Sequence, residues 1–239
     1  MFQSEILSPI IIIGMHRSGT TLVSQLLNEA GVHQGVFRDH NSEAFHFLSI
    51  NQQVLGNSGS SWLEPKVPEE QNWFKISAKD LYQIHFQNAS PRFSGRTKWG
   101  WKDPRNTFTL SMYLKMFPNA KVIHVIRNGM DVALSLKSRN GVLNEPEIKD
   151  LDSLAFNFNL WERYVEQGES NRKLGDRFLD IKYEDLLNNP STELQKMSRF
   201  CSTTVQDKNG LIRSYKPKSY SPELKAIAGQ SAIYNKWYT

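Results

Sequence analysis

The clearest hydrophobic pattern in the chain is a run of isoleucines at positions 10–13 that ends at Gly14. A short uninterrupted apolar run of this kind is typical of a strand buried on both faces of a parallel sheet. Behind it, apolar residues recur at helical spacing and predict an amphipathic helix that stops at Gly31. The residues of this stripe are Leu22, Val23, Leu26, Leu27 and Ala30. This part of the sequence therefore predicts a strand, a loop and a helix.

Strand and helix patterns alternate through the rest of the sequence. Strand patterns return at residues 121–126 and 177–183, and more weakly at 96–101. An apolar stripe over residues 151–165 and the pair Asn189-Pro190, which is typical of a helix start, predict helices. This alternation predicts an α/β protein with a P-loop-type three-layer fold, in which a central parallel sheet is flanked by helices. Such folds bind their ligands at the carboxyl ends of the strands.

Length, charge and cysteine content narrow the class of protein. The 239 residues fit one α/β domain, so we predict a single domain over residues 1–239. The net charge of +5 fits an anionic ligand, and small polyanions are favoured over nucleic acid because no basic run with interleaved aromatic residues is present. The single cysteine, Cys201, excludes an intrachain disulfide and favours a reducing cytosol.

The sequence also shows no pattern of a membrane protein. No apolar stretch reaches the roughly 20 residues of a membrane-spanning helix, and residues 1–5 lack the basic flank of a signal peptide. We therefore expect a cytoplasmic protein with no membrane span and no nucleic-acid partner. Nothing in the sequence indicates its oligomeric state.

The loop after the first strand carries the strongest functional signal. It reads Gly14-Met15-His16-Arg17-Ser18-Gly19-Thr20-Thr21 and matches the spacing G-x-x-x-x-G-K-[ST], except that Thr20 stands in place of the lysine. Free N–H groups and the positive end of the macrodipole at a helix start bind phosphate, and the two glycines let the backbone approach it closely. We therefore predict a phosphate site formed by His16, Arg17, Ser18, Gly19, Thr20 and Thr21, although not that of an ordinary triphosphatase. The alternative is a plain turn between a core strand and a core helix.

A second anion signal follows the strand at residues 121–126. Arg127 emerges at its end, and Ser135 lies in a helix predicted over residues 130–139, so the two side chains are expected to converge on one phosphate. The alternative is that Arg127 pairs with Asp131 and that Ser135 bonds to its own helix. Two separate phosphate sites indicate a nucleotide with phosphates at two places on the ribose.

In combination, these segments resemble sulfotransferases. The resemblance rests on the loop at residues 14–22, Lys102-Asp103-Pro104, the segment from Val122 to Ser135 and the segment from Ile181 to Leu186, and it spans residues 9 to about 200. It is closest to the bacterial carbohydrate-type and tyrosylprotein-type branches, which carry arginine where cytosolic members carry a loop lysine.

The resemblance implies the donor and where it binds. The donor would be the co-substrate 3′-phosphoadenosine 5′-phosphosulfate, with its 5′-phosphosulfate in the first loop and its 3′-phosphate on Arg127 and Ser135. Tyr183 would contact the adenine, and a basic segment containing Arg213 would close over the nucleotide. No metal is expected, and the acceptor would be a small-molecule, carbohydrate or peptide hydroxyl.

Sulfuryl transfer needs an in-line arrangement and cations near the departing phosphate. Arg17 and Lys102 are the predicted cations, and removing either is expected to cost roughly a hundredfold in rate. In similar enzymes a lysine just before Asp-Pro has this role, whereas the alternative for Lys102 is a surface lysine at a strand end. Arg105 and Asp103 are expected to hold the loop by ion pairing.

Glu43 is the predicted general base, with His46 as its rival. At a helical spacing of three, His46 would share a face with Glu43, and the sequence leaves the choice open. Either residue has an ordinary structural alternative, as a first-turn acid or a histidine at the core edge.

Two other features bear on the acceptor. Residues 56–72, rich in Gly, Ser, Pro and Glu, are predicted to form a loop over the site. Four tryptophans either line a sugar-stacking cleft or belong to the core, namely Trp62, Trp73, Trp99 and Trp101. Two further functions stay open: a P-loop small-molecule kinase, and a non-catalytic nucleotide-binding protein of the same fold.

Overall fold

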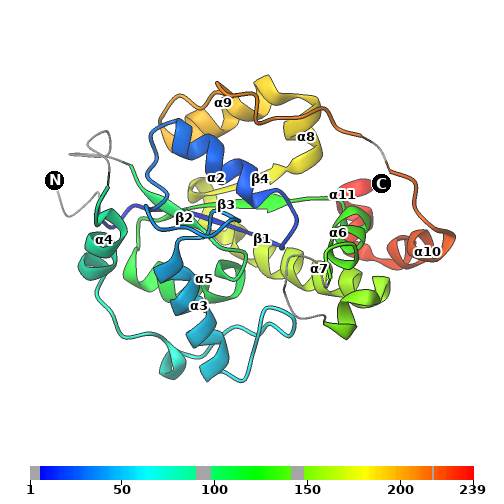
Figure 1. Ribbon diagram of the computed structural model, residues 1–239, viewed down its shortest axis with the longest axis horizontal. Helices are drawn as coiled ribbons and strands as arrows, with labels where there is room; N and C mark the ends of the chain where they lie inside the picture. Colours follow the sequence, from blue (N-terminus) through cyan, green and yellow to red (C-terminus); the bar gives the residue numbers. More distant parts are fainter. Residues whose placement is uncertain (1–5, 90–97, 141–147, 217) are drawn as a thin grey trace.

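The computed structural model describes residues 6–89, 98–140, 148–216 and 218–239. At its centre, four parallel strands of the described chain form one sheet in the order β2-β1-β3-β4 (Figure 1). The strands are β1 (Ile10–Gly14), β2 (Gly100–Lys102), β3 (Lys121–Ile126) and β4 (Phe178–Lys182). Parallel pairing aligns Ile12 with Ile123, and Ile123 with Leu179. The carboxyl ends of all these strands therefore point to the same edge of the sheet.

The strand predictions agree closely with this sheet. Residues 121–126 are confirmed as a strand, and the pattern at 177–183 forms β4. The weaker strand pattern at 96–101 only partly overlaps the observed strand, because β2 begins at Gly100 and ends at Lys102. Residues 96 and 97 lie outside the described residues. A Cβ at Gly100 would lie 2.0 Å from the carbonyl oxygen of Ile10, so the close approach of β2 to β1 requires glycine there.

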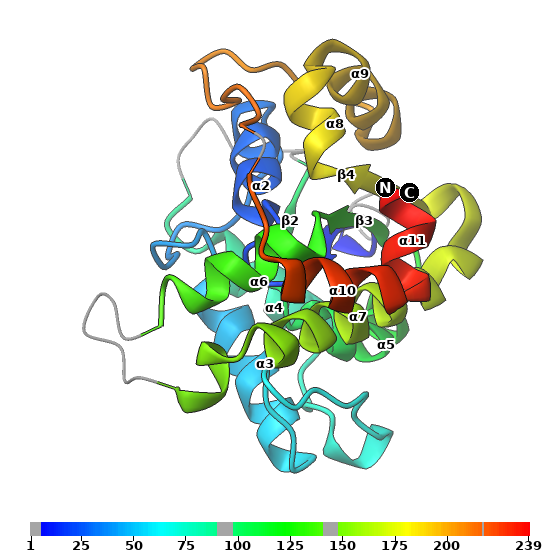
Figure 2. The same cartoon turned by 90° about the vertical axis from the view of Figure 1, so that its right-hand side faces the viewer.

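Alternate isoleucines of β1 face two different helical layers. Ile10 and Ile12 pack in a core with α2 (Thr20–Glu29), α8 (Tyr183–Asn188) and α9 (Pro190–Cys201). Ile11 and Ile13 pack on the opposite face with α3 (Phe45–Asn57) and α5 (Asn106–Met116). Because side chains alternate along a strand, one apolar run fills both cores. Figures 1 and 2 show the resulting three layers, which confirm the predicted fold class.

The helix predictions are also confirmed. The stripe at 151–165 lies in α7 (Leu154–Glu169), although Leu151 belongs to the preceding 3₁₀ helix η3 (Lys149–Asp152). Pro190 is at the start of α9, and Gly31 has the left-handed φ of 86° expected after α2. The helix after β3, α6 (Gly129–Lys137), begins where the side chain of Asn128 accepts a hydrogen bond from the backbone N–H of Met130.

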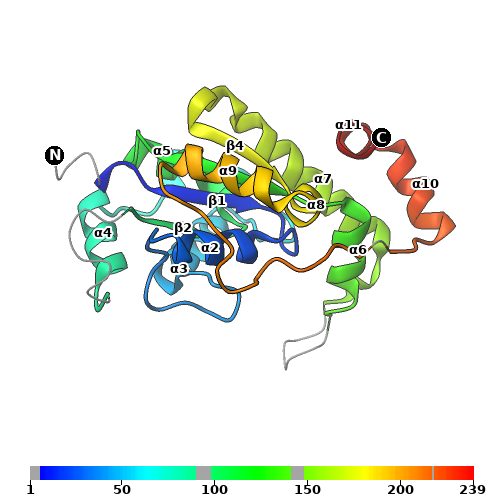
Figure 3. The same cartoon turned by 90° about the horizontal axis from the view of Figure 1, so that it is seen from above.

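Further helices lie toward the two ends of the sheet. Helix α4 (Ala78–Phe86) is at one end, and α10 (Pro222–Gln230) and α11 (Ala232–Tyr238) are at the other, as Figures 1 and 3 show. The other 3₁₀ helices are η1 (Glu70–Asn72) and η4 (Ser170–Arg177). The loop predicted at 56–72 is irregular between the end of α3 and the start of η1. In the described parts of the chain, every helix is too short or too polar to cross a membrane.

Candidate active site

Two glycines shape the loop between β1 and α2. Gly14 and Gly19 have φ angles of 135° and 91°, in the region that favours glycine. A Cβ at Gly14 would lie 2.4 Å from the carbonyl oxygen of Val125, and one at Gly19 would lie 2.3 Å from Cδ2 of Tyr183. The loop therefore runs in close contact with β3 and with the start of α8. The hydroxyl of Ser18 is buried and makes no hydrogen bond within the described chain.

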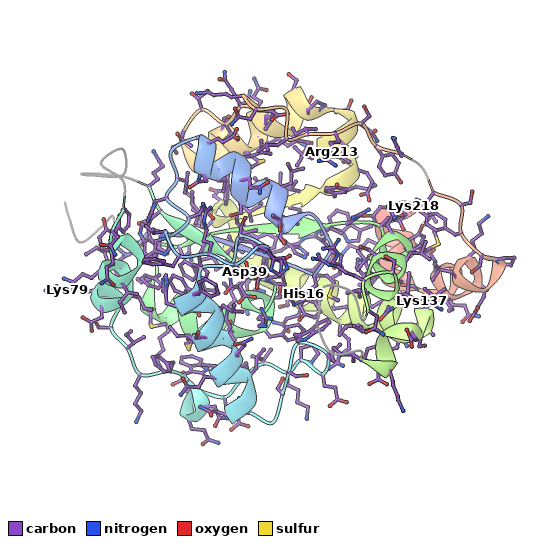
Figure 4. All side chains as sticks on the ribbon, viewed as in Figure 1. His16, Asp39, Lys79, Lys137, Arg213 and Lys218 are labelled. Atoms are coloured by element: carbon purple, nitrogen blue, oxygen red, sulfur yellow. The ribbon has the colours of Figure 1, made fainter. Side chains whose placement is uncertain are left out.

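A cavity of about 530 Å³ opens at the carboxyl ends of the strands. Figure 4 shows His16 and Asp39, which both line it, close together between α2 and α3. The other lining residues come from the first loop and the start of α2, α3 and the segments on either side of it, the end of β2 and the turn that follows, the residue after β3, the end of α6 with the segment beyond it, and the start of α8. They include Arg17, Gly19, Thr20, Thr21, Asn41, Glu43, Gln52, Trp62, Lys102, Arg105, Arg127, Arg139 and Tyr183.

Arg127 and Ser135 meet the first loop through Arg17. The guanidinium of Arg127 donates from Nη1 to the carbonyl oxygen of Arg17 at 3.1 Å, and Arg17 donates from Nε to Oγ of Ser135 at 3.0 Å. Arg127 also pairs with Asp131 at 3.3 Å, as the alternative interpretation expected, and lies 4.7 Å above the ring of Tyr183. The Nε of Arg127 is buried without a hydrogen-bond partner among the described residues. Arg17 therefore links Arg127 to Ser135, although Ser135 is not among the residues that line the cavity, and the convergence of the two side chains on one phosphate stays a prediction.

Positive charge gathers around this contact. Burial lowers the pKa of Arg17, and the nearby cations Arg139 and Arg127 lower it further. Arg139 lines the cavity, but the sequence analysis did not single it out. Its position four residues after Ser135, about one helical turn, was the available signal. Such a cluster of guanidinium groups is suited to a multiply charged anion.

Glu43, which also lines the cavity, lies between two cations. Its Oε1 is 3.0 Å from Nζ of Lys102, and its Oε2 is 3.1 Å from Nη1 of Arg105. Lys102 is only 1% exposed, which excludes the surface-lysine interpretation. Burial raises the pKa of Glu43, the carboxylate of Asp103 adds to this rise, and Lys102 and Arg105 oppose it.

A tight turn before α3 holds the backbone of Glu43. Arg38 and Ala44 form an antiparallel bridge, and the backbone N–H of Asp39 donates to the carbonyl oxygen of Glu43 at 3.0 Å. The carboxylate of Asp39 accepts the backbone N–H groups of Glu43 and Asn41 at 2.7 and 2.9 Å. These local bonds, typical of an aspartate in a turn, direct the Glu43 side chain into the cavity.

His46 lies elsewhere. Glu43 precedes α3, so the helical spacing that would have placed the two side chains on one face does not apply. Nε2 of His46 lies 3.3 Å from Nδ1 of His85, and His46 does not line the cavity. Burial, with the nearby His33, lowers the pKa of His46 to about 4. This geometry favours Glu43, and its role as the base stays a prediction.

Of the four tryptophans, Trp62 lines the cavity, where its ring packs 4.7 Å from that of His16. Trp99 and Trp101 are buried in the core with Phe47, and Trp73 packs against the same core. The sugar-cleft interpretation therefore retains support at Trp62 alone among these four residues.

The imidazole of His16 is buried beside several cations. Burial lowers the pKa of His16 well below its usual range, with Arg105, Lys102 and Arg17 adding to the effect.

The basic C-terminal segment lies mostly away from the cavity. Arg213 is exposed and outside the cavity lining, and Figure 4 shows it beside α8. Lys218 lies closer to the second anion site, because its Nζ is 3.5 Å from Oδ1 of Asp131. The role predicted for Arg213 therefore stays a prediction.

The fold and this site define a class of protein. The model of the Sulfotransferase family matches residues 9–207. The chain therefore belongs to the sulfotransferase family.

Two curated relatives show how this chain compares in sequence. The omega-hydroxy-beta-dihydromenaquinone-9 sulfotransferase of Mycobacterium tuberculosis is 24% identical over 243 residues, which cover 79% of this chain and 61% of the relative. Protein-tyrosine sulfotransferase A of Caenorhabditis elegans is 27% identical over 213 residues, which cover 84% of this chain and 52% of the relative. The chain thus spans between about half and three fifths of the length of these relatives.

Solved structures share the fold. A sulfotransferase from Alicyclobacillus acidocaldarius has a TM-score of 0.61 and 14% identity, and the match covers 93% of this chain and 90% of that one. A mouse sulfotransferase complexed with PAP has a TM-score of 0.51 and 18% identity, and the match covers 84% of this chain and 61% of that one. At these identities the likeness is one of fold.

Proposed function

We propose that this protein transfers a sulfuryl group from 3′-phosphoadenosine 5′-phosphosulfate to a hydroxyl acceptor. The observation that carries the proposal is that the phosphate loop, the Arg127–Ser135 region and the Glu43–Lys102 pair all line one cavity or contact its lining. The phosphate loop and the Arg127–Ser135 region fit the two phosphorylated ends of the donor. The Glu43–Lys102 pair fits the base and the cation that sulfuryl transfer needs. The presence of PAP in the mouse neighbour supports the choice of donor.

The loop and the second anion site have the groups that such a nucleotide needs. The backbone N–H groups at the start of α2 and the hydroxyl of Thr20 would hold the 5′ end, and the Thr21 hydroxyl, which donates to the carbonyl oxygen of Asn41 at 2.9 Å, would have to leave that bond to join them. The buried Ser18 hydroxyl and the Nε of Arg127, both without a partner in the described chain, fit an additional anionic ligand. Arg127 and Ser135 would hold the 3′-phosphate, and Tyr183, whose ring lies beside Gly19, would contact the adenine.

The catalytic roles follow from charge. When bound, the donor supplies the sulfuryl group, whose bond to the phosphate oxygen breaks as a bond to the acceptor oxygen forms. Glu43 accepts the proton of the acceptor hydroxyl. Lys102 and Arg17 place positive charge where negative charge gathers on the departing phosphate.

The acceptor is proposed only by class. The names of the two relatives specify a menaquinone derivative and protein tyrosine, both of which carry a hydroxyl. A small-molecule, carbohydrate or peptide hydroxyl fits these, and Trp62 offers a flat face in the cavity. In the described residues no cluster of three or more His, Cys, Asp or Glu side chains is suited to a metal ion. Metal independence, a cytoplasmic location and the lack of a nucleic-acid partner all stay predictions.

Nucleotide binding tests the proposal directly. We expect 3′-phosphoadenosine 5′-phosphate to bind by calorimetry and to raise the unfolding temperature, because a ligand at about 100 times its Kd adds about 2.7 kcal/mol of stability. Mg·ATP is expected to give no comparable shift, because β1 ends at Gly14 and β3 is followed by Arg127, so neither strand end offers an acid for Mg²⁺. Stabilisation by Mg·ATP alone would favour the kinase alternative.

A further inference from the structure

The two cations that contact Glu43 are anchored very differently. Nζ of Lys102 donates to Oε1 of Glu43 at the end of a flexible side chain. Arg105, in contrast, is tied to Asp103 twice, since its Nη1 and its backbone N–H both lie 2.9 Å from Oδ1 of that residue. The same Nη1 contacts Glu43 at 3.1 Å.

Asp103 is itself part of a buried network. Its side chain is fully buried, and its Oδ2 accepts a hydrogen bond from Nδ2 of Asn51 in α3 at 2.9 Å. Oδ1 of Asn51 in turn accepts the hydroxyls of Thr109 and Tyr113, both in α5, at 2.7 and 2.9 Å. Through this network Arg105 is fixed to two helices on one face of the sheet, and its guanidinium cannot move toward a ligand without breaking its hydrogen bond to the buried Asp103 carboxylate.

The proposed reaction makes different demands on the two cations. Lys102 has to turn from Glu43 toward the departing phosphate to act there. The carboxylate of Glu43 is only 5% exposed, and an ionised carboxylate in such a place is costly without a partner. A second, stationary cation removes that cost while leaving Lys102 free to move.

We propose that Arg105 is a positioning residue that keeps the Glu43 carboxylate ionised and directed into the cavity while Lys102 engages the donor. This inference rests on the proposed function, in which Glu43 is the base. It assigns to Arg105 a role separate from holding the loop, because the guanidinium touches both Asp103 and Glu43.

The direction of the effect follows from the charges around Glu43. Burial and the carboxylate of Asp103 raise its pKa, whereas Lys102 and Arg105 lower it. Burial opposes the charge on Arg105, but Asp103 and Glu43 outweigh it, so the pKa of Arg105 is raised and its charge persists at any working pH. The titratable and charged groups that face Glu43 from the elements around it are Asp39, Lys102, Asp103, Arg105 and Tyr164. Losing the Arg105 charge therefore raises the pKa of Glu43.

The pKa of Glu43 can be measured without an acceptor substrate. We would titrate protein carrying ¹³C-labelled glutamate carboxyls by NMR and identify the Glu43 signal by its loss in Glu43→Gln. In Arg105→Gln the pKa of Glu43 should rise by about one unit or more, as expected for removing an opposite charge within hydrogen-bond distance. Arg105→Lys, which keeps the charge, should stay within about half a unit of the natural protein. As a matched control, Arg177→Gln removes an arginine whose Nη1 contacts the carbonyl oxygen of Pro118, and it should leave the pKa unchanged.

The outcomes separate the two proposals. An unchanged Glu43 pKa in Arg105→Gln overturns the role of Arg105, whatever nucleotide the protein binds. If that variant fails to fold by circular dichroism, a shift of more than about one unit in Arg105→Lys overturns it instead. If calorimetry shows that the natural protein does not bind 3′-phosphoadenosine 5′-phosphate, the proposed function is overturned. The effect of Arg105 on the pKa of Glu43 can still be measured in that case. With this nucleotide bound, a Glu43 pKa above about 7 would also contradict the inference, since Arg105 would not be keeping the base ionised.

Discussion

At the scale of single residues, Gly19 and Gly31 have the same left-handed backbone but different surroundings. Their φ angles are 91° and 86°. A Cβ at Gly19 would lie 2.3 Å from the ring of Tyr183, whereas a Cβ at Gly31 would have no described heavy atom within 4 Å. The left-handed backbone thus favours glycine at both positions. Of these two glycines, only Gly19 also lacks room for a side chain, because it lies against Tyr183 of the proposed nucleotide site.

This difference predicts two distinct phenotypes. Gly31→Ala should cost about 1–2 kcal/mol of stability through the strained backbone, with no change in nucleotide affinity. Gly19→Ala should in addition displace the Tyr183 ring that lies under Arg127, and lower the affinity for 3′-phosphoadenosine 5′-phosphate by roughly tenfold or more. Urea unfolding and calorimetry measure the two effects. Equal affinities in both variants would contradict the assignment of Gly19 and Tyr183 to the site.

At the scale of elements, a glycine in α7 sets how closely this helix approaches β3. A Cβ at Gly168 would lie 2.3 Å from Nε2 of His124. The other ring nitrogen of His124 contacts Asp180 of β4 at 2.9 Å, so the ring connects β3 to β4 while α7 lies against it. Close packing of a helix on a sheet therefore depends here on one missing side chain.

The same substitution in two helices should have opposite effects. Gly168→Ala should lower the free energy of unfolding by about 1–3 kcal/mol, because overpacking forces the His124 ring or the helix to move. Gly229→Ala in α10, where no described atom lies within 4 Å of the added Cβ, should raise stability by up to about 1 kcal/mol through helix propensity. Urea denaturation of both variants checks this, and a loss of stability in both would show that space is not the deciding factor.

At the scale of the whole molecule, the C-terminal helices return to the segment that carries Arg127. Figure 2 shows α10 and α11 alongside α6 and α7. Nδ2 of Asn128 donates to the hydroxyl of Tyr234 at 3.1 Å, and Glu184 accepts the Asn128 N–H at 2.9 Å and the Tyr238 hydroxyl at 3.1 Å. Residues more than 100 positions apart thus hold the residue next to Arg127 in place.

Loss of the Tyr234 hydroxyl should therefore reach the second anion site. Tyr234→Phe leaves the Asn128 amide without this partner, and we expect stability to fall by about 1–3 kcal/mol and nucleotide affinity to fall with it. Ser221→Ala, which removes the cap of α10 at Leu224, is the control for loosening these helices without touching Asn128. Calorimetry that finds the two variants equal in affinity would argue against a link from α11 to Arg127.

That residues 1–239 form one domain stays a prediction.

The sequence by itself determined the features that arise from neighbours in the chain. The isoleucine run, the glycine spacing of the loop and the Asn189-Pro190 helix start each express a local preference of the backbone, and the structure confirms the elements they predict. Arg127 was also recognisable, because the end of a buried strand fixes where the following residue emerges.

Only the tertiary structure decided which distant side chains meet. Glu43 and Lys102 are 59 positions apart, and Arg17 and Ser135 are 118 apart, so no local pattern encodes their contacts. The turn at Asp39 places Glu43 before α3, so Glu43 and His46 do not share a helix face. Trp99 and Trp101 are buried in the core, whereas Trp62 lines the cavity. These outcomes depend on how the layers pack around the sheet, because burial and long-range contact are properties of the folded molecule rather than of any segment.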